Sequence, residues 1–381
     1  MSNRRLSLGP IHSGLRSLYY RLPLATRRRL RRFRRQHLKP LRDTLPLSVP
    51  ETIHLDPTNL CNFKCTFCPT GDRALLKSVG RPIGQMKLEL FQKIVDDLAD
   101  MIEKYDSRPS LLHLYKDGEP LLNKQFPEMV RYAKKRNVAR IVSTTSNGAL
   151  ITEELASRIA ESGLDQIRIS VEHVSDKGYE DITLTFSDYE KVRRNVEILY
   201  LAKQRAKSSL RVFVKITDTG LKPEEKKKFE EDFGPIADML TVDTLMGWSM
   251  SEVKDFTLGM TPATGMDSIS PLRERLVCPE PFSRLAVNFD GQVSVCCVDW
   301  SFGTIVGDLK TNTLDEIWNG EKLRAFRLTH LQGKRSTIPA CAKCQYLRGF
   351  SPSRDLDSEA RDLIPIYSEA AAGGAGRKID R

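Results

Sequence analysis

The chain has 381 residues, of which 40% are hydrophobic and 29% are charged, a composition typical of a folded protein with a substantial core. Its formal net charge of +11 is concentrated at one end, because residues 1–42 contain 13 Lys and Arg and no Asp or Glu, so the remainder carries −2. No run of roughly 18 apolar residues and no cleavable signal pattern is present, so we expect a cytoplasmic protein rather than one that spans a membrane.

A basic leader is expected over residues 1–48. Within it, the run from Ala25 to Leu41 interleaves arginines with Leu and Phe. Such a segment can lie on an anionic membrane surface, bind nucleic-acid phosphates, or remain a solvated arm. We favour an anionic membrane surface, contacted through residues 16–42, over nucleic acid because aromatic residues accompany the arginines. This would place the protein peripherally on the inner membrane surface and would suit a lipid-linked sugar as substrate.

Strand-like and helical segments then alternate up to residue 246. We expect strands ending at Pro57 and over 111–115, 140–146, 166–172, 211–217 and 239–246. We expect helices over 88–102, 126–135, 153–162, 189–203 and 223–233. Strands separated by helices of this length form parallel βα units. Six such units predict an α/β fold that is either a partial barrel or an open doubly wound sheet.

The C-terminal part has a different pattern. Residues 247–277 contain several Gly and Pro and are predicted to connect two domains. Asp290-Gly291, between two apolar segments, predicts a β-hairpin, followed by a helix near 314–328. We therefore expect a leader (1–48), a core barrel (49–250), a small second domain (251–350) and a partly disordered tail (351–381).

Three cysteines follow the first strand with the spacing C-x3-C-x2-C: Cys61, Cys65 and Cys68. The carboxyl end of a strand is where α/β folds carry their chemistry. Three thiolates are one fewer than a 4Fe–4S cluster usually has, so a cluster bound here would keep one iron open to another ligand. A zinc site or a set of structural thiols is the alternative.

This segment, with Phe67 before the third cysteine, resembles the signature of the radical S-adenosylmethionine (SAM) superfamily. The resemblance implies that SAM binds the open iron. It also implies that a flavodoxin- or ferredoxin-type protein supplies an electron, and that a 5′-deoxyadenosyl radical abstracts hydrogen from the substrate. It further implies cofactor contacts after three later strands: Gly118, Glu119 and Pro120; Ser143, Ser146 and Asn147; and Ser170 and Glu172. Lys215 is a further candidate for the pocket.

A second set of cysteines, Cys278, Cys296, Cys341 and Cys344, can form a closed site with four thiolates. Their spacing alone allows either a 4Fe–4S cluster or zinc. The surrounding sequence resembles the SPASM domain in its shortened form, called twitch. This resemblance implies one auxiliary 4Fe–4S cluster. The fold implied as a whole is a partial (β/α)6 TIM-like barrel with a small C-terminal α+β auxiliary-cluster domain.

The two resemblances together imply an oxidoreductase that acts on a sugar or an aminocyclitol. Dehydrogenation is our first interpretation because one auxiliary cluster can take up the second electron. Cys297 is left over, and a hydrogen atom donated from its thiol to a substrate radical would instead make the enzyme an epimerase. Modification of a peptide or of RNA is a further alternative. We expect Trp248, Asp299 and Trp300 to line the mouth of the barrel.

Overall fold

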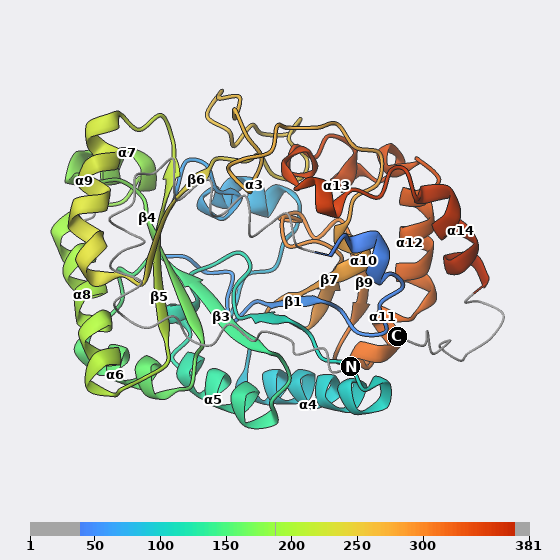
Figure 1. Ribbon diagram of the computed structural model, residues 1–381, viewed down its shortest axis with the longest axis horizontal. Helices are drawn as coiled ribbons and strands as arrows, with labels where there is room; N and C mark the ends of the chain where they lie inside the picture. Colours follow the sequence, from blue (N-terminus) through green and yellow to red (C-terminus); the bar gives the residue numbers. More distant parts are fainter. Residues whose placement is uncertain (1–38, 187, 370–381) are drawn as a thin grey trace, which may run out of the picture. The chain divides into compact units, whose positions relative to one another are not determined.

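A computed structural model describes residues 39–186 and 188–369. The described chain from Pro40 to Glu369 forms one compact unit (Figure 1). Most of the basic leader, including all but the last residues of the segments 16–42 and Ala25 to Leu41, lies outside the described residues.

One sheet of nine strands runs through the unit in the order β6-β5-β4-β3-β2-β1-β7-β8-β9. The first six strands are parallel to one another, as predicted. They are β1 (Thr52–Leu55), β2 (Leu111–His113), β3 (Ile141–Ser146), β4 (Gln166–Val171), β5 (Arg211–Asp218) and β6 (Met239–Thr244). Figure 1 shows the connecting helices on the outer side of these strands: α4 (Leu88–Tyr105), α5 (Phe126–Arg136), α6 (Glu153–Glu161), α8 (Tyr189–Arg205) and α9 (Pro223–Phe233). The partial TIM-like α/β barrel is therefore confirmed.

The two faces of the strands differ in burial. On β5, Val212, Val214 and Ile216 are fully buried, whereas the alternate residues, Phe213 and Lys215 among them, are half-buried. Successive side chains of a strand point to opposite faces of a sheet. The apolar set therefore packs under the helices, and the alternate set faces the barrel interior.

The C-terminal part continues this sheet instead of forming a separate one. β7 (Arg284–Val287) pairs in parallel with β1, with Thr52 opposite Arg284. β8 (Gln292–Ser294) and β9 (Ile305–Asp308) then add in antiparallel fashion, which confirms the hairpin at Asp290-Gly291. The pairing covers an edge of β1 that would otherwise expose unpaired backbone groups.

Several helices were not predicted from the sequence. The single helix expected near 314–328 is two, α11 (Leu314–Trp318) and α12 (Glu321–Leu331), because Gly320 between them has extended backbone angles (φ −75°, ψ 165°). The others are short or lie near the C-terminus: α3 (Arg73–Ser78), α7 (Asp176–Thr183), α10 (Glu280–Ser283), α13 (Pro339–Ala342) and α14 (Ala360–Glu369). Across residues 39–186 and 188–369, no helix is long and apolar enough to cross a bilayer.

Both ends of the described chain belong to the compact unit. Leu41 and Leu45, which the sequence placed in the leader, pack in one small core with Leu363 and Tyr367 of α14. Arg42 also forms an ion pair of 2.9 Å with Glu359. The tail therefore packs onto the fold as far as Tyr367, and residues 370–381 lie outside the described residues.

Candidate functional site

The loop that carries Cys61, Cys65 and Cys68 follows β1 and is fastened to α7. The Lys64 N–H donates to the Thr183 carbonyl (2.9 Å), and the Thr66 N–H donates to the Ile182 carbonyl (2.8 Å). Within the loop, the Cys68 N–H donates to the Cys65 carbonyl at 3.0 Å. These backbone bonds fix the three cysteines against the C-terminal end of the barrel.

The three thiols lie close enough to affect one another's ionisation. Burial, the largest effect on each thiol, raises the pKa of Cys61 to about 12. It also raises the pKa values of Cys65 and Cys68 above their usual range. The carboxylate of Glu172 raises all three pKa values further, and neighbouring thiols also raise those of Cys61 and Cys65. Within the described ranges, no three His, Cys, Asp or Glu side chains converge at the spacing of a single metal ion. Buried thiolates need a compensating cation, and a donor set of three thiols suits an iron–sulfur cluster with one open iron.

Gly118 packs directly against the start of this loop. A Cβ atom at Gly118 would lie 2.2 Å from the Thr58 carbonyl oxygen and 2.4 Å from the Leu60 carbonyl oxygen. The next residue, Glu119, donates its backbone N–H to the same Leu60 carbonyl at 2.8 Å. Only glycine allows the end of β2 to approach the backbone before Cys61 so closely.

The Glu119 carboxylate joins the ends of β2 and β3. It accepts hydrogen bonds from the Ser146 hydroxyl (2.8 Å) and the Asn147 N–H (2.7 Å). The Asn147 side-chain amide in turn donates to Asn62 Oδ1 at 2.8 Å. Burial raises the pKa of Glu119 to about 7, against the opposing effect of these hydrogen bonds. The structure thus brings Glu119, Ser146 and Asn147 together beside the cysteine loop, and Pro120 is buried next to them.

The remaining cofactor candidates are more spread out. Ser143 lies deeper in the barrel, 2.6 Å from His113 Nδ1, and does not join the Glu119 group. Ser170 pairs in register with Lys215 on the neighbouring strand. Glu172 is buried, which raises its pKa to about 7, while the Lys215 cation acts in the opposite direction. Lys215 Nζ also lies 3.7 Å from Asp243 Oδ2, so this lysine remains within the barrel interior.

Three polar aromatic residues inside the barrel were missed from the sequence. The rings of His54 and His113 lie 5.2 Å apart, and those of His113 and Tyr115 lie 5.3 Å apart. Burial lowers the pKa of His54 to about 3, and that of His113 also falls well below its usual value. Burial raises the pKa of Tyr115, as do the thiols of Cys68 and Cys297, so this phenol lies near both groups of cysteines. The alternation of His113 and Tyr115 on one strand face was the available signal.

The second set of cysteines comes from separate segments. Cys278 precedes α10, Cys296 follows β8, and Cys341 and Cys344 lie in and after α13. Burial raises the pKa of Cys278, and the carboxylate of Glu280 and the thiols of Cys344 and Cys341 raise it further. The pKa of Cys296 is raised first by a hydrogen bond with Cys297 and then by burial. The four thiols are therefore gathered in one region, where their chemistry suits a cluster ligated entirely by protein.

Cys297 faces a different environment from Cys296. Its thiol lies 3.9 Å from Glu280 Oε2, within hydrogen-bonding distance for sulfur. It is half-buried, and it influences the ionisation of Tyr115 in the barrel and of Tyr346 after α13. Cys297 thus lies between the second cysteine set and the barrel interior.

A buried ionic network connects the ends of β1 and β2 with the loop after Cys297. Asp117 accepts from Arg81 Nη2 at 2.6 Å and forms an ion pair with Lys116, and none of these three side chains is exposed. Lys116 Nζ donates to the Asp299 carbonyl (3.2 Å), and Arg81 donates to the Trp300 carbonyl (3.1 Å). The expectation that Asp299 and Trp300 line the barrel mouth is wrong, because both are fully buried.

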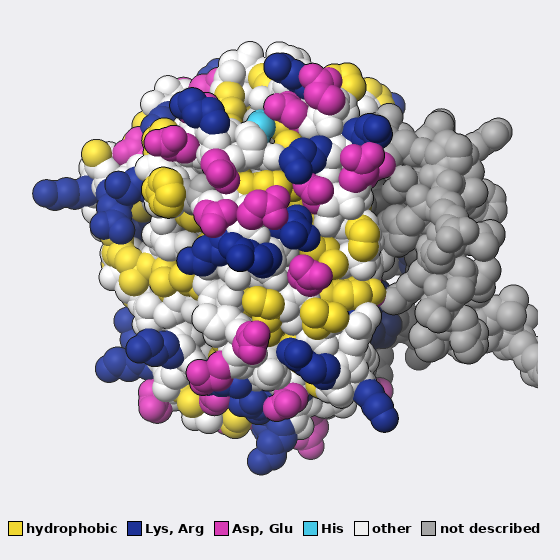
Figure 2. All heavy atoms as spheres, turned by 90° about the vertical axis from the view of Figure 1, so that its left-hand side faces the viewer, with side chains coloured by type: hydrophobic (Ala, Val, Ile, Leu, Met, Phe, Trp, Pro, Cys, Tyr) yellow, Lys and Arg dark blue, Asp and Glu magenta, His cyan; other side chains and the backbone are white. Residues whose placement is uncertain are grey.

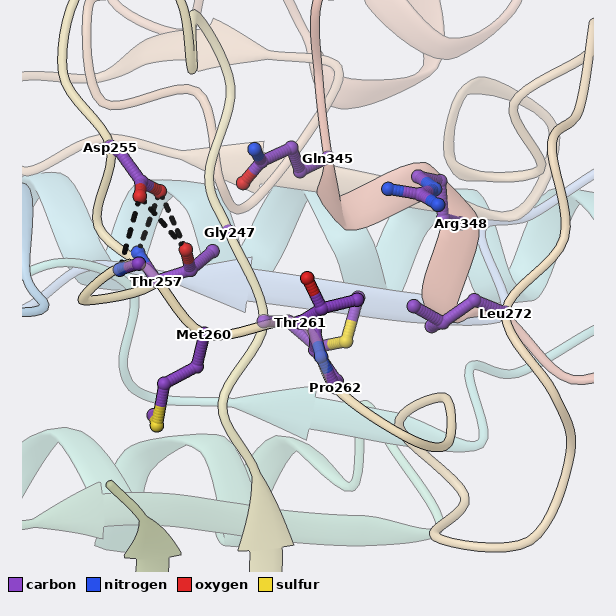
Figure 3. Close-up of a pocket in the computed structure, with 11 residues that line it drawn as sticks. Gly247, Asp255, Thr257, Met260, Thr261, Pro262, Leu272, Gln345 and Arg348 are labelled. Carbon is purple, nitrogen blue, oxygen red and sulfur yellow. Dashed lines mark hydrogen bonds between the residues drawn. The ribbon is translucent and has the colours of Figure 1, made fainter. Parts of the chain in front are cut away.

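A cavity of about 230 Å³ lies between the segment after β6 and the residues after Cys344. Figure 3 shows Gln345 and Arg348 on one side of it, and Asp255 and Thr257 joined by hydrogen bonds on the other. Thr244 at the end of β6 lies 3.4 Å from Thr264 Oγ1, so this segment borders the C-terminal edge of the sheet. The cavity is therefore at the end of the barrel where α/β enzymes bind ligands.

Comparison with known proteins agrees with this arrangement. Residues 55–233 match the Radical SAM superfamily, and residues 278–345 match the SPASM iron–sulfur cluster-binding domain. The tungsten-containing aldehyde ferredoxin oxidoreductase cofactor-modifying protein of Pyrococcus furiosus is 26% identical over 343 residues, which cover 80% of this chain and 90% of that protein.

Two solved structures share the fold. BtrN in complex with AdoMet and 2-DOIA has a TM-score of 0.50 at 17% identity and covers 78% of this chain and 93% of its own. Streptococcus suis SuiB bound to S-adenosylmethionine has a TM-score of 0.55 at 12% identity and covers 81% of this chain and 74% of its own. The chain therefore carries a Radical SAM domain and a SPASM iron–sulfur cluster-binding domain, and these two domains imply 4Fe–4S clusters and S-adenosylmethionine as cofactors.

Proposed function

We propose that this protein is a radical SAM dehydrogenase that oxidises an alcohol carbon of a sugar or aminocyclitol. When bound, S-adenosylmethionine and its cluster supply the radical that removes a hydrogen atom, and an auxiliary cluster can take up the second electron of the oxidation. The observation that carries the proposal is the second cysteine set. Four half-buried thiols gathered in one region would leave a cluster no free iron for substrate, which supports a role in electron uptake.

The roles of the individual residues follow from their positions. Cys61, Cys65 and Cys68 would hold the cofactor-binding cluster. Glu119 would orient the cofactor's amino group, since its carboxylate lies beside the cysteine loop and already fixes Ser146 and Asn147. Cys278, Cys296, Cys341 and Cys344 would hold the auxiliary cluster.

The other sequence candidates would contact the cofactor from β4 or shape the cysteine loop. Ser170 and Glu172 would contact the ribose and carboxylate from β4, and Phe67 and Gly118 would shape the loop itself. Ser143 is less favoured as a cofactor contact, because its hydroxyl is bonded to His113 in the barrel interior.

A polar small molecule suits the interior of the barrel. Ser170, Lys215 and Asp243 are half-buried on its inner face, and the cavity at the end of β6 adds Gln345 and Arg348. Hydroxyl groups of a substrate could replace water on such side chains without leaving buried polar groups unpaired. The similarity in fold to BtrN, which was solved with a small molecule beside AdoMet, agrees with this class of substrate.

The external partners belong to the same proposal. A flavodoxin- or ferredoxin-type protein would supply the electron that starts each turnover. On the face formed by α7, α8 and α9, Figure 2 shows acidic and basic side chains intermingled, so this face presents no field of one sign to such a donor. Contact of residues 16–42 with an anionic membrane remains a prediction.

A direct test uses a panel of sugars and aminocyclitols deuterated at each alcohol carbon. The reconstituted enzyme is incubated anaerobically with reductant, and the products are analysed by mass spectrometry. We expect one substrate to transfer deuterium to 5′-deoxyadenosine and to give a ketone in equal amount. Cleavage of S-adenosylmethionine without deuterium transfer from any member of the panel would refute this substrate class.

Epimerisation is the second candidate, and the position of Cys297 favours it. The thiol lies between the second cysteine set and Tyr115, where it could give a hydrogen atom to a substrate radical. The same deuterium experiment separates the two reactions, because an epimerase returns a hydrogen from solvent to carbon and forms no ketone. The similarity to the cofactor-modifying protein of Pyrococcus furiosus adds a third substrate class, a cofactor of another enzyme.

A further inference from the structure

The three tryptophans of the chain make the same type of contact in three places. Each indole N–H donates to a backbone carbonyl: Trp248 to Phe67 (3.0 Å), Trp300 to Ser249 (2.9 Å) and Trp318 to Leu47 (2.8 Å). Two of these bonds involve adjacent residues, because Trp248 donates in one and Ser249 accepts in the other. Trp318 lies elsewhere, in α11, and its indole bonds to Leu47, which belongs to neither cysteine loop.

Trp248 is bonded to both cysteine-bearing regions at once. Its indole holds the carbonyl of Phe67, the residue before Cys68. Its own carbonyl accepts the N–H of Gln345, the residue after Cys344, at 3.3 Å. One residue therefore bridges the loop of the first cysteine set and the last ligand candidate of the second.

Ser249 extends the bridge to a third cysteine-bearing loop. Its hydroxyl donates to the Val298 carbonyl at 2.7 Å, and its carbonyl receives the Trp300 indole. Val298 follows Cys296 and Cys297 directly. Ser249 and Trp300 are both buried, so water does not compete for these bonds.

Gly247 leaves room for the hydrogen bond between Trp248 and Gln345. A Cβ atom at Gly247 would lie 2.0 Å from Gln345 Oε1 and 2.7 Å from Gln345 Cβ. Figure 3 shows Gly247 next to the Gln345 side chain at the edge of the cavity. The absence of a side chain lets the Gln345 backbone come within hydrogen-bonding distance of Trp248.

The ionic network reinforces the bridge from a second direction. The Thr70 hydroxyl, two residues after Cys68, donates to the Asp117 carbonyl at 2.8 Å. Asp117 is held by Arg81, whose other nitrogen donates to the Trp300 carbonyl. The first cysteine loop is thus tied to the loop after Cys297 through two separate sets of buried bonds.

We propose that the Trp248–Ser249 segment sets the distance between the two iron–sulfur clusters, with Trp248 as the positioning residue. The proposal uses the ligand assignments of the proposed function but not its substrate. A bridge of hydrogen bonds and packed backbone holds the clusters at a constant separation in a way that flexible loops could not. Electron exchange between clusters, and the space left for a substrate between them, both depend on that separation.

The test compares three matched variants, Trp248→Phe, Trp300→Phe and Trp318→Phe. Each variant removes one indole N–H from one backbone carbonyl, with the same loss of volume. Iron content and thermal unfolding are measured first, on full-length protein reconstituted anaerobically. The proteins are then fully reduced without substrate, and the microwave power that half-saturates the EPR signal is measured, since a nearby second cluster accelerates spin relaxation.

We expect Trp248→Phe to keep its iron and to saturate at a lower power, because the clusters are less firmly held together. Trp318→Phe should show wild-type saturation even if its unfolding temperature falls, and Trp300→Phe should lie between the two. Wild-type saturation in Trp248→Phe would overturn the proposal. If Trp248→Phe loses iron, Gly247→Ala serves in its place, because it keeps the indole and displaces Gln345, and unchanged saturation there overturns the proposal equally.

These outcomes are separable from failure of the proposed function. The EPR measurement needs no substrate, so an enzyme that acts on another substrate class would still give the predicted shift. A dehydrogenase with unchanged saturation in Trp248→Phe would retain its function while the positioning role is refuted.

Discussion

Replacing Gly118 by alanine tests whether the end of β2 must pack closely against the first cysteine loop. The added Cβ would lie 2.2 Å from the Thr58 carbonyl oxygen and 2.4 Å from the Leu60 carbonyl oxygen, whereas ordinary contacts begin at 3.4 Å. Both neighbours are backbone atoms and cannot rotate away. The loop or the strand end must therefore move by roughly 1 Å, and the moving residues directly precede Cys61.

A displacement of about 1 Å near a reacting centre can lower a rate on the order of 100-fold. Overpacking of a filled site also costs about 1–3 kcal/mol of unfolding free energy. We therefore expect Gly118→Ala to form 5′-deoxyadenosine about 100-fold more slowly than the wild type. The assay is chromatography of 5′-deoxyadenosine after anaerobic reconstitution and reduction, with iron content determined on the same samples.

Gly234→Ala is the matched control. A Cβ at Gly234 would have no neighbour within 4 Å, and its backbone is helical with φ −54°, so alanine fits there. This variant should keep the wild-type rate. A Gly118→Ala protein that cleaves S-adenosylmethionine as fast as Gly234→Ala would refute the reasoning about close packing.

Three further outcomes follow from the buried charges and from Cys297. Lys116→Met should lower the unfolding free energy by about 3–5 kcal/mol in urea titrations, since it removes one partner of a fully buried ion pair. Lys177→Met, at an exposed ion pair, should leave the unfolding free energy nearly unchanged, and equal losses in the two variants would contradict the burial argument. Burial raises the pKa of Asp56 in the folded protein to about 8. Between the usual pKa of an aspartate and pH 8, the folded protein therefore keeps a proton on Asp56 that the unfolded chain has released. The free energy of unfolding should fall as the pH rises through this range. Asp56→Asn should flatten this pH dependence of thermal unfolding, and an unchanged slope would show that Asp56 is ionised in the fold. Cys297→Ala should keep ketone formation within about tenfold of the wild type if the enzyme is a dehydrogenase; loss of product with continued cleavage of S-adenosylmethionine would instead favour the epimerase.

The barrel could be predicted from the sequence because each of its elements carries a local pattern. The helix expected over 189–203 is observed as α8, Tyr189–Arg205, and the strand expected over 211–217 is observed as β5, Arg211–Asp218. Their apolar residues recur at the periods of a helix and a strand, which burial under the neighbouring layer requires. The spacing of Cys61, Cys65 and Cys68 is equally local, whereas the second set of cysteines spans residues 278–344 and was assigned through the resemblance of the surrounding sequence.

The contacts between the two cysteine sets could not be predicted in this way. The hydrogen bond between Trp248 and Phe67 joins residues 181 positions apart, and no local pattern marks either partner. The pairing of β1 with β7 likewise joins Thr52 with Arg284. Asp299 and Trp300 were expected at the barrel mouth. The sequence does not show that Asp299 is enclosed by its own loop, where it accepts from the Thr304 N–H at 2.8 Å.

The most direct test of the account is the iron content of the anaerobically reconstituted protein beside two triple variants. One lacks Cys61, Cys65 and Cys68, and the other lacks Cys278, Cys341 and Cys344. The account predicts about eight irons per chain in the wild type and about four in each variant, with cleavage of S-adenosylmethionine abolished only when the first set is removed. About four irons in the wild type, unchanged when the second set is removed, would contradict the assignment of an auxiliary cluster to those cysteines.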